Sequence, residues 1–293
     1  MTSRFDPVIS AAFHDLVDQH EAFLFDAYGV LVDAHGALEG ASRAIETLAR
    51  AKRPFLVVSN DASRSAQTAS KRFKGLGIAI EPEHVLSSGM LVAPHLRALG
   101  LDRARCIVLG TGDSAQYARE AGAEVLANDP EQIATSATID AVVLADERGF
   151  DFLATMDAVL TMLLRAFESG RSVALLAANP DLVYPSKDGR FAFTAGTLAR
   201  MLEEALALRL GDGAPRFTAL GKPSRAIFDE ACARVATRDC VMFGDQLHTD
   251  VIGANEAGLH SALVLTGVTS REALERSRIR PKYLLDRVFD ERA

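Results

Sequence analysis

The fold is decided by one short stretch, which reads Phe23-Leu24-Phe25-Asp26-Ala27-Tyr28-Gly29-Val30-Leu31. Its apolar start is typical of a strand buried on both faces of a parallel sheet. Because a charged residue is unfavourable inside such a strand, we expect Asp26 to lie just past the strand's carboxyl end. Open α/β sheets bind their ligands at that edge. On this stretch alone, an Asp26 that merely caps the following turn is an equal alternative.

Apolar runs followed by polar residues recur along the whole chain. We predict further strands at 55–58, 106–109, 141–144, 173–176, 217–220, 241–243, 262–265 and 283–285. Helical patterns separate or follow these runs at 41–51, 65–76, 114–122, 152–168, 196–209, 224–235 and 250–257, and residues 1–20 have the pattern of an amphipathic helix. Strands that alternate with helices indicate βαβ units and an α/β fold with a doubly wound parallel sheet.

The composition is that of a soluble globular protein, and the length of 293 residues fits about two domains. The net charge of −7 argues against nucleic acid or an anionic membrane as a partner. We expect the basic clusters Lys52-Arg53 and Lys71-Arg72-Lys74 to be solvated. The three cysteines are too few for a disulfide framework and show no metal-ligand spacing, which favours buried thiols. With no signal peptide or membrane span in the sequence, we expect a cytoplasmic protein.

Four polar groups each follow a predicted strand in the outer parts of the chain. They are Asp26, Ser59-Asn60, Lys222, and Asp245 with Asp250. If their strands are neighbours in one parallel sheet, these groups meet at its carboxyl edge. Such a set suits Mg²⁺ and a phosphoryl group, because Mg²⁺ prefers oxygen ligands and is usually held by one or two carboxylates plus phosphate oxygens.

Four segments together resemble the ordered motifs of the haloacid dehalogenase-like (HAD) hydrolase superfamily: Asp26-Ala27-Tyr28-Gly29-Val30, Ser59-Asn60, Gly221-Lys222-Pro223 and Gly244-Asp245…Asp250. The long insert between the second and third motifs resembles the class IIA branch, which includes nitrophenyl-phosphate, pyridoxal-phosphate, phosphoglycolate and sugar-phosphate phosphatases. The resemblance implies a catalytic core at residues 1–86 and 215–293. It also implies an α/β cap at residues 87–214 that closes over the site and excludes water. Because relatives in this branch often dimerise through the cap, a homodimer is one expected state.

The resemblance also implies a role for each motif residue in an Mg²⁺-dependent phosphomonoester hydrolase that acts on a small phosphorylated metabolite. Asp26 is the nucleophile, forming an aspartyl-phosphate that water then hydrolyses. Mg²⁺ is held by Asp26, the backbone carbonyl of Tyr28 and Asp245. Asp250 acts from behind them, on Lys222 or on a metal-bound water. The residues expected to bind the substrate are Ser59, Asn60, Asp61, Lys222 and Tyr184.

Tyr28 departs from the family pattern, because most phosphatases of the family carry a second Asp there as general acid and base. A phenol with an ordinary pKa near 10 is a poor base at neutral pH, and an acid/base residue is typically worth roughly 10²- to 10⁴-fold in rate. Asp33 and His35 are candidate replacements, although a solvated loop is the favoured interpretation of both.

Two alternatives follow from Tyr28. One is a 2-haloacid dehalogenase, whose nucleophile loop resembles Asp26-Ala27-Tyr28-Gly29 and which expels halide without a proton or a metal. The other is a phosphate-ester binding protein with impaired turnover. Asp245 and the large insert favour the phosphatase. Within the insert, Asn179-Pro180-Asp181 resembles a recurring turn of class IIA caps, with an Asp-capped turn as an equal alternative, and Thr111-Gly112-Asp113 is a candidate anion cradle.

Overall fold

The computed structural model describes residues 7–185 and 190–289, and these divide into two compact units. The first unit contains the residues up to Ser59, then Ala66–Leu86 and the residues from Lys222 onward. The second unit contains Asn60–Ser65 and Ser87–Gly221. The observed units therefore differ from the predicted boundary at 214, and they place the short segment after Ser59 in the second unit.

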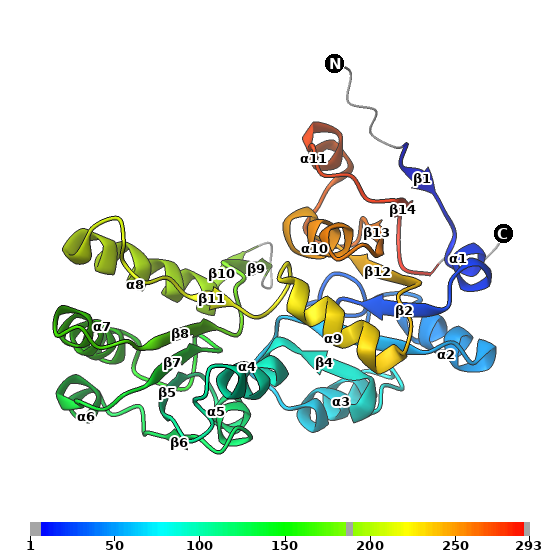
Figure 1. Ribbon diagram of the computed structural model, residues 1–293. Helices are drawn as coiled ribbons and strands as arrows, with labels where there is room; N and C mark the ends of the chain where they lie inside the picture. Colours follow the sequence, from blue (N-terminus) through cyan, green and yellow to red (C-terminus); the bar gives the residue numbers. More distant parts are fainter. Residues whose placement is uncertain (1–6, 186–189, 290–293) are drawn as a thin grey trace. The chain divides into compact units, whose positions relative to one another are not determined.

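The first unit is built on a seven-stranded sheet (Figure 1). Its spatial order is β1 (Ile9–Ser10), β14 (Tyr283–Leu285), β13 (His260–Val264), β12 (Cys240–Gly244), β2 (Ala22–Phe25), β3 (Phe55–Ser59) and β4 (Val85–Ser87). Every pair from β1 to β3 is parallel. The central strands β2 and β12 are buried along their whole length, as expected where helices cover both faces. The predicted α/β fold with a parallel sheet is confirmed.

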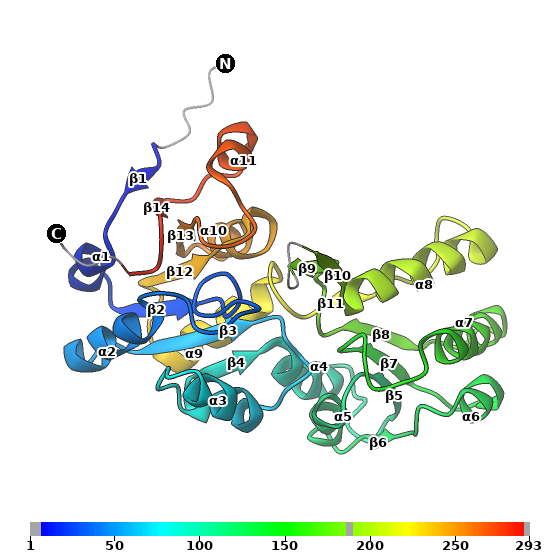
Figure 2. The same ribbon diagram turned by 180° about the vertical axis from the view of Figure 1, so that it is seen from behind.

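Helices cover the sheet of the first unit on its two faces. They are α1 (Phe13–Gln19), α2 (Ala41–Ala51), α3 (Ala66–Gly75), α9 (Arg225–Val235), α10 (Ile252–Glu256) and α11 (Arg271–Arg276), with a 3-10 turn η1 (Pro82–His84) and a π-helical turn η4 (Leu247–Val251). On one face Phe13 of α1 packs against Phe23 and Phe243, with ring centroids 6.0 and 5.6 Å away. Helix α9 lies in front of the sheet in Figure 1 and behind it in Figure 2.

The predicted helix over residues 1–20 is wrong in its middle part, since Ile9–Ser10 form strand β1 and the helix begins only at Phe13. The backbone N–H of Ile9 donates to the carbonyl of Lys282 at 3.0 Å, so this short segment extends the sheet beyond β14. Residues 1–6 lie outside the described part of the chain. The other predicted strands and helices are confirmed to within a few residues.

The second unit contains a five-stranded parallel sheet in the order β11 (Thr218–Ala219), β8 (Ala174–Ala177), β7 (Ala141–Leu144), β5 (Arg105–Leu109) and β6 (Glu124–Val125). Strands β9 (Val183–Pro185) and β10 (Phe191–Phe193) form a separate antiparallel pair. The helices are η2 (Ser88–Leu91), α4 (Val92–Ala98), α5 (Gly112–Arg119), α6 (Pro130–Thr135), α7 (Phe152–Glu168) and α8 (Ala195–Leu210). Because β11 pairs with β8, the second unit continues to Gly221.

Two further expectations can be compared with the structure. All three cysteines are unbridged and buried, as predicted. Among the helices of the described residues, we find none with the length and apolar content needed to cross a membrane.

Candidate active site

Asp26 lies directly after strand β2 and is 7% exposed. Its backbone N–H donates to the carbonyl of Phe243, the next-to-last residue of β12, at 2.8 Å. Strands β2 and β12 are parallel neighbours, so the residues that follow them share one edge of the sheet. Asp245 follows β12 at this edge, and the pairing of the two strands explains why the two aspartates meet.

A third aspartate, Asp250, joins this pair from the π-helical turn η4. Its Oδ2 accepts a hydrogen bond of 3.1 Å from the backbone N–H of Gln246, which turns its carboxylate back toward the sheet edge. One carboxylate oxygen each from Asp26, Asp245 and Asp250 lies within 4.8 Å of the others, and all three residues are buried. Such a cluster is unfavourable unless positive charge compensates it.

Lys222 provides part of that compensation. Its Nζ lies 2.7 Å from Oδ1 of Asp26 and 2.7 Å from Oδ1 of Asp250, and the side chain is 2% exposed. The condition that all four strands are neighbours in one sheet is not met for Lys222, because the strand before it, β11, belongs to the other sheet. Lys222 instead reaches the carboxylates from the loop before α9. Three carboxylates against one ammonium leave an excess of negative charge at a buried site.

The pKa values of these groups show how the site responds to that excess. Burial raises the pKa of Asp26 from its ordinary value of 3.8 to about 7, although the Lys222 ammonium opposes the rise. Burial, Asp26 and Asp250 likewise raise the pKa of Asp245 well above 3.8. Loss of water would by itself lower the pKa of Lys222, but Asp250 and Asp26 together raise it. Protonation of an aspartate is therefore one way to relieve the repulsion, and a bound cation is another.

The surroundings of the Asp245 carboxylate suit a bound cation. Its Oδ2 accepts a hydrogen bond of 2.7 Å from the backbone N–H of Val268, whereas its Oδ1 is buried and has no hydrogen-bond partner among the described residues. A buried carboxylate oxygen without a partner is costly. Oxygen ligands of this kind select a hard divalent ion such as Mg²⁺.

Two glycines leave the space that these carboxylates occupy. A Cβ on Gly29, which has a φ of 77°, would lie 2.4 Å from Oδ2 of Asp245. A Cβ on Gly244 would lie 2.1 Å from the Cβ of Asp250. Both motif glycines are therefore required by the close approach of an aspartate.

The side chain of Tyr28 is held by Arg72 of helix α3. Its hydroxyl accepts a hydrogen bond of 2.7 Å from Nη2 of Arg72 on α3, and the Arg72 guanidinium carbon lies 4.9 Å from the centre of the Tyr28 ring. The expectation that the whole Lys71-Arg72-Lys74 cluster is solvated is wrong for Arg72, which is half-buried. Sequence reasoning missed this pair, and only the unusual Tyr28 could have prompted a search for its partner.

The three polar residues Ser59, Asn60 and Asp61 are divided between the two units. Ser59 ends β3, beside β2, and belongs to the first unit. In the second unit, the amide of Asn60 donates to Oδ1 of Asp181 at 2.9 Å. Asp61 accepts a hydrogen bond of 2.9 Å from the backbone N–H of Ser63 and pairs with Arg64. Asp61 thus builds a local turn, and its predicted contact with substrate stays a prediction.

Tyr184 lies on β9 in the second unit and is half-buried. Its hydroxyl accepts a hydrogen bond of 3.4 Å from Nη2 of Arg148, and Arg148 also pairs with Glu147 at 3.0 Å. Tyr184 is thereby placed beside a cation of the same unit. Its contact with substrate stays a prediction.

The remaining candidates from the sequence serve as local structure. Oδ1 of Asp33 accepts hydrogen bonds from the backbone N–H groups of His35 and Gly36, at 2.7 and 2.9 Å, which closes the loop after Tyr28. In the second unit, Thr111 caps helix α5, and Oδ2 of Asp113 accepts from the backbone N–H of Ser65. These groups are engaged with protein atoms, which weakens the idea of an anion cradle at Thr111-Gly112-Asp113.

The turn at Asn179-Pro180-Asp181 is capped by its first residue, since Oδ1 of Asn179 accepts from the backbone N–H of Asp181 at 3.0 Å. The contact caps the turn with Asn179, and the alternative of a turn capped by Asp181 stays a prediction. The Asp181 carboxylate is used to hold Asn60.

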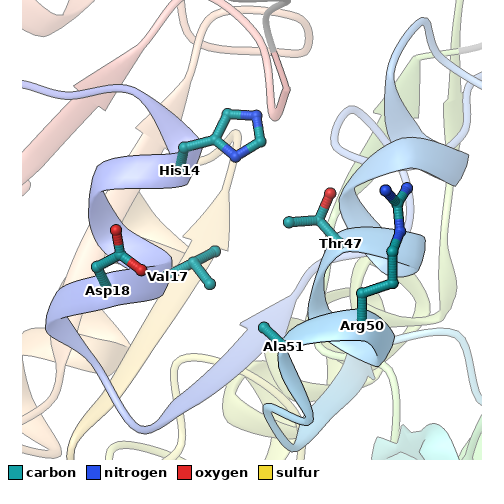
Figure 3. A pocket seen from close by; sticks show the side chains of 6 residues that line it. All are labelled: His14, Val17, Asp18, Thr47, Arg50 and Ala51. Carbon is teal, nitrogen blue, oxygen red and sulfur yellow. The ribbon is translucent and has the colours of Figure 1, made fainter.

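A surface hollow of about 510 Å³ lies between α1 and α2 of the first unit (Figure 3). Its lining residues are His14, Val17, Asp18, Thr47, Arg50 and Ala51. None of the predicted site residues lines it, and we assign it no function.

The chain is similar to known proteins along most of its length. A family profile described as haloacid dehalogenase-like hydrolase matches residues 23–124, and one described as HAD-hydrolase-like matches residues 219–290. The glycerol-3-phosphate phosphatase of Gallus gallus is 29% identical over 92% of this chain and 90% of the relative.

Solved structures agree with these sequence matches. A protein from Cytophaga hutchinsonii described as a possible sugar phosphatase has a TM-score of 0.84 and 29% identity, covering 98% of this chain and 100% of that one. The glycerol phosphate phosphatase of Mycobacterium tuberculosis, solved in complex with magnesium, has a TM-score of 0.75 and 29% identity, covering 93% of this chain and 76% of that one.

Proposed function

The chain belongs to the haloacid dehalogenase-like hydrolases, in the class IIA phosphatase branch, and from this premise we propose that it hydrolyses a small phosphate monoester through an aspartyl-phosphate on Asp26 with the help of Mg²⁺. It is an enzyme of the phosphatase type, and its relatives act on small phosphate esters. The names of these relatives make glycerol 3-phosphate the first substrate to test.

The observation that carries the proposal is the charge imbalance at the carboxyl edge of the sheet. Asp26, Asp245 and Asp250 converge within 4.8 Å, and Lys222 is the ammonium that pairs with two of them. A divalent cation would balance the remaining charge and would give the buried Oδ1 of Asp245 a ligand. The residues proposed to hold Mg²⁺ are Asp26, the Tyr28 carbonyl and Asp245, with Asp250 behind them. When bound, the ion would offset the repulsion between the nucleophile and the phosphate and stabilise charge on the transferring group.

Asp26 is the proposed nucleophile because it lies at the sheet edge with its Oδ1 held by Lys222 at 2.7 Å. A carboxylate oxygen attacks phosphorus, the bond to the ester oxygen breaks, and that oxygen leaves with the bonding electron pair. Water then attacks the phosphorus of the aspartyl-phosphate, which releases inorganic phosphate and restores the carboxylate. The Lys222 ammonium can stabilise the negative charge of the phosphoryl oxygens during both steps.

Among the described residues, the site lacks an evident general acid to protonate the leaving ester oxygen. At the sequence position of the usual acid stands Tyr28, whose phenol is a much weaker acid than a carboxyl group and whose hydroxyl oxygen accepts from Arg72. Asp33 is committed to its own loop. We therefore propose that turnover depends strongly on the leaving group, being favoured for esters whose alcohol is acidic and needs no proton on departure.

The direct test is incubation of the purified protein with Mg²⁺ and p-nitrophenyl phosphate, with Asp26→Asn as the matched control. We expect turnover that is abolished by a chelator and by Asp26→Asn. Turnover equal in the two proteins would overturn the assignment of Asp26.

The same preparation distinguishes the two alternatives raised by Tyr28. A dehalogenase would release halide from a 2-haloacid, and neither a chelator nor Asp245→Ala would affect the release. A binding protein with impaired turnover would bind phosphate esters with Mg²⁺ but form no product, and Tyr28→Asp should then markedly raise hydrolysis of p-nitrophenyl phosphate itself. The three converging carboxylates favour the phosphatase over the dehalogenase, because a metal-free dehalogenase does not require them.

A further inference from the structure

A second cluster of metal-ligating side chains lies at the opposite edge of the same sheet. His20 precedes β2, Asp239 immediately precedes β12, and His260 is the first residue of β13. These three strands are consecutive neighbours, and all run parallel. Asp26 and Asp245 follow the carboxyl ends of β2 and β12, six residues after His20 and Asp239 respectively, so the two clusters are separated by roughly 20 Å at about 3.3 Å per residue.

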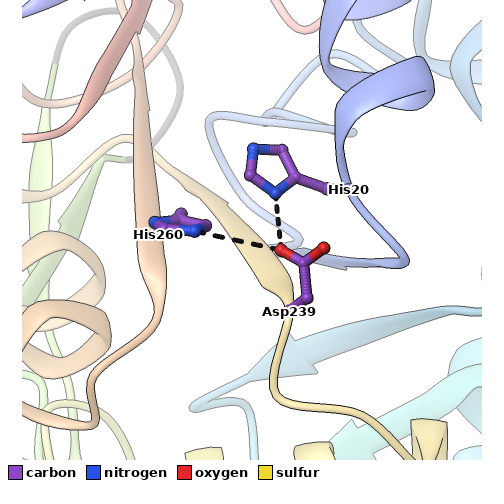
Figure 4. A group of neighbouring side chains, drawn as sticks. All are labelled: His20, Asp239 and His260. Atoms are coloured by element: carbon purple, nitrogen blue, oxygen red, sulfur yellow. Dashed lines mark hydrogen bonds and ion pairs between the residues drawn. The ribbon is translucent and has the colours of Figure 1, made fainter.

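The three side chains converge on one point. Nδ1 of His20 lies 2.6 Å from Oδ1 of Asp239, and Nε2 of His260 lies 3.9 Å from the same oxygen. The two imidazole rings have centroids 4.7 Å apart. Figure 4 shows the two rings directed at the carboxylate from separate elements of the chain. One ligand atom from each residue lies within 4.8 Å of the others.

We propose that His20, Asp239 and His260 form a binding site for a divalent transition-metal ion such as Zn²⁺, with water as the fourth ligand. Two imidazoles and one carboxylate suit Zn²⁺ and related ions, whereas Mg²⁺ prefers sites made of oxygen ligands alone. Ligand bonds of about 2.0–2.1 Å place the ligand atoms of a tetrahedral site roughly 3.3 Å apart. The ion therefore requires His20 and Asp239 to separate slightly and His260 to approach.

His20 carries the support that metal-binding histidines usually have. The ring is 6% exposed, and its other nitrogen, Nε2, lies 2.9 Å from the hydroxyl of Tyr283. A metal at Nδ1 places the ring proton on Nε2, and the Tyr283 hydroxyl can then accept that proton's hydrogen bond, since a hydroxyl both donates and accepts. Such partners fix the orientation of the ring and typically change metal affinity by 10- to 100-fold.

Lys282 opposes binding. Its Nζ lies 3.3 Å from Nδ1 of His260. A metal at Nε2 of His260 leaves the ring proton on Nδ1, which would then face the ammonium. The half-buried lysine has to swing away, and it also places positive charge near the ion. Lys282 therefore weakens the affinity of the site for a metal ion. Removing the charge of Lys282 should strengthen metal binding.

The test is a titration of metal-free full-length protein with Zn²⁺ in the presence of saturating Mg²⁺, followed by calorimetry. A parallel titration with Co²⁺ is followed by visible absorption, which reports a four-coordinate site directly. We expect one equivalent of Zn²⁺ to bind, His260→Asn to weaken it by at least roughly tenfold, and Tyr283→Phe to weaken it by about tenfold. Lys282→Gln should tighten it. His260 is 37% exposed, so its substitution should leave the fold intact, and thermal unfolding checks this.

His35→Asn is the matched control, because His35 also lies beside an aspartate, 3.5 Å from Asp33, but this pair belongs to neither group of converging metal-ligand side chains found among the described residues. It should not change Zn²⁺ binding. Asp245→Asn in the same titration shows whether the bound ion occupies the other carboxylates. Binding that is lost with Asp245→Asn, or that is unchanged by both His260→Asn and Lys282→Gln, overturns the proposal.

Discussion

The guanidinium of Arg72 donates a hydrogen bond of 2.7 Å to the hydroxyl of Tyr28 and lies over its ring. This pair occupies the position from which the phosphatases that the sequence resembles supply a carboxylate acid and base. The backbone carbonyl of Tyr28 is unaffected by the pairing, so the proposed metal site and the missing proton donor can be tested separately.

Replacing Tyr28 by aspartate should restore a proton donor. We expect Tyr28→Asp to raise the turnover of glycerol 3-phosphate, whose alkoxide is a poor leaving group, by roughly 10²-fold or more. The turnover of p-nitrophenyl phosphate should change little. Tyr28→Phe is the control, because it keeps the ring and the carbonyl and removes only the hydroxyl. Steady-state kinetics on both substrates measure the effect, and equal changes for both substrates would contradict the account of Tyr28.

The raised pKa of Asp26 predicts a specific pH dependence of stability without metal. The folded-state pKa of about 7 exceeds the ordinary value of 3.8, so the folded protein binds more protons than the unfolded chain between these values. Ionising Asp26 therefore destabilises the fold as pH rises from about 4 to 7, by at most about 4 kcal/mol. Asp26→Asn lacks this penalty.

Thermal unfolding of both proteins in a chelator, across this pH range, tests the prediction. The melting temperature of Asp26→Asn should rise relative to the wild-type protein as pH increases. Saturating Mg²⁺ should reduce the difference, because a cation on the ionised carboxylate replaces the proton. If the difference in melting temperature between the two proteins depends on neither pH nor Mg²⁺, the ionisation of Asp26 does not destabilise the fold, which would contradict the prediction.

Lys222→Met removes the ammonium from between Asp26 and Asp250. Breaking a buried ion pair on one side leaves an uncompensated charge, and we expect a loss of about 3–5 kcal/mol in the free energy of unfolding, together with loss of turnover. Lys71→Met is the control, since Lys71 is exposed on α3. Chemical denaturation measures both, and a Lys222 variant as stable as the Lys71 variant would contradict the prediction.

Gly244→Ala tests whether the close approach of Asp250 is required. The new Cβ would lie 2.1 Å from the Cβ of Asp250, so Asp250 and its partner Lys222 must shift. Because small displacements of catalytic groups are costly, we expect turnover to fall by roughly 10²-fold. Gly75→Ala meets no atom within 4 Å and should be active. Equal activity of the two variants would show that the packing at Gly244 does not matter.

Much of the fold and part of the site could be predicted from local pattern. The buried runs ending at Phe25 and Gly244 identified two strands, and each is followed by an aspartate of the site. The pairing of β2 with β12 then brings Asp26 and Asp245 together. Local pattern sufficed here because each strand is long enough to form an apolar run that can be recognised in the sequence as a buried strand.

Other features depend on contacts that no local pattern encodes. Strand β1 has only two residues, too few to show a period, and its pairing with β14 is remote in sequence. Strand β11 also has only two residues, and its pairing with β8 places the strand before Lys222 in the other sheet. Tyr28 with Arg72, and His20 with Asp239, are side-chain contacts between distant elements. Such contacts become visible only when the chain is folded.

The most direct test of the central claim is acid quenching of the protein during turnover of p-nitrophenyl phosphate with Mg²⁺, followed by mass spectrometry of its peptides. The account predicts a phosphoryl group on the peptide that contains Asp26, absent from the Asp26→Asn variant, which should not turn over substrate. Turnover by Asp26→Asn, or a phosphoryl group trapped on a different residue, would contradict it.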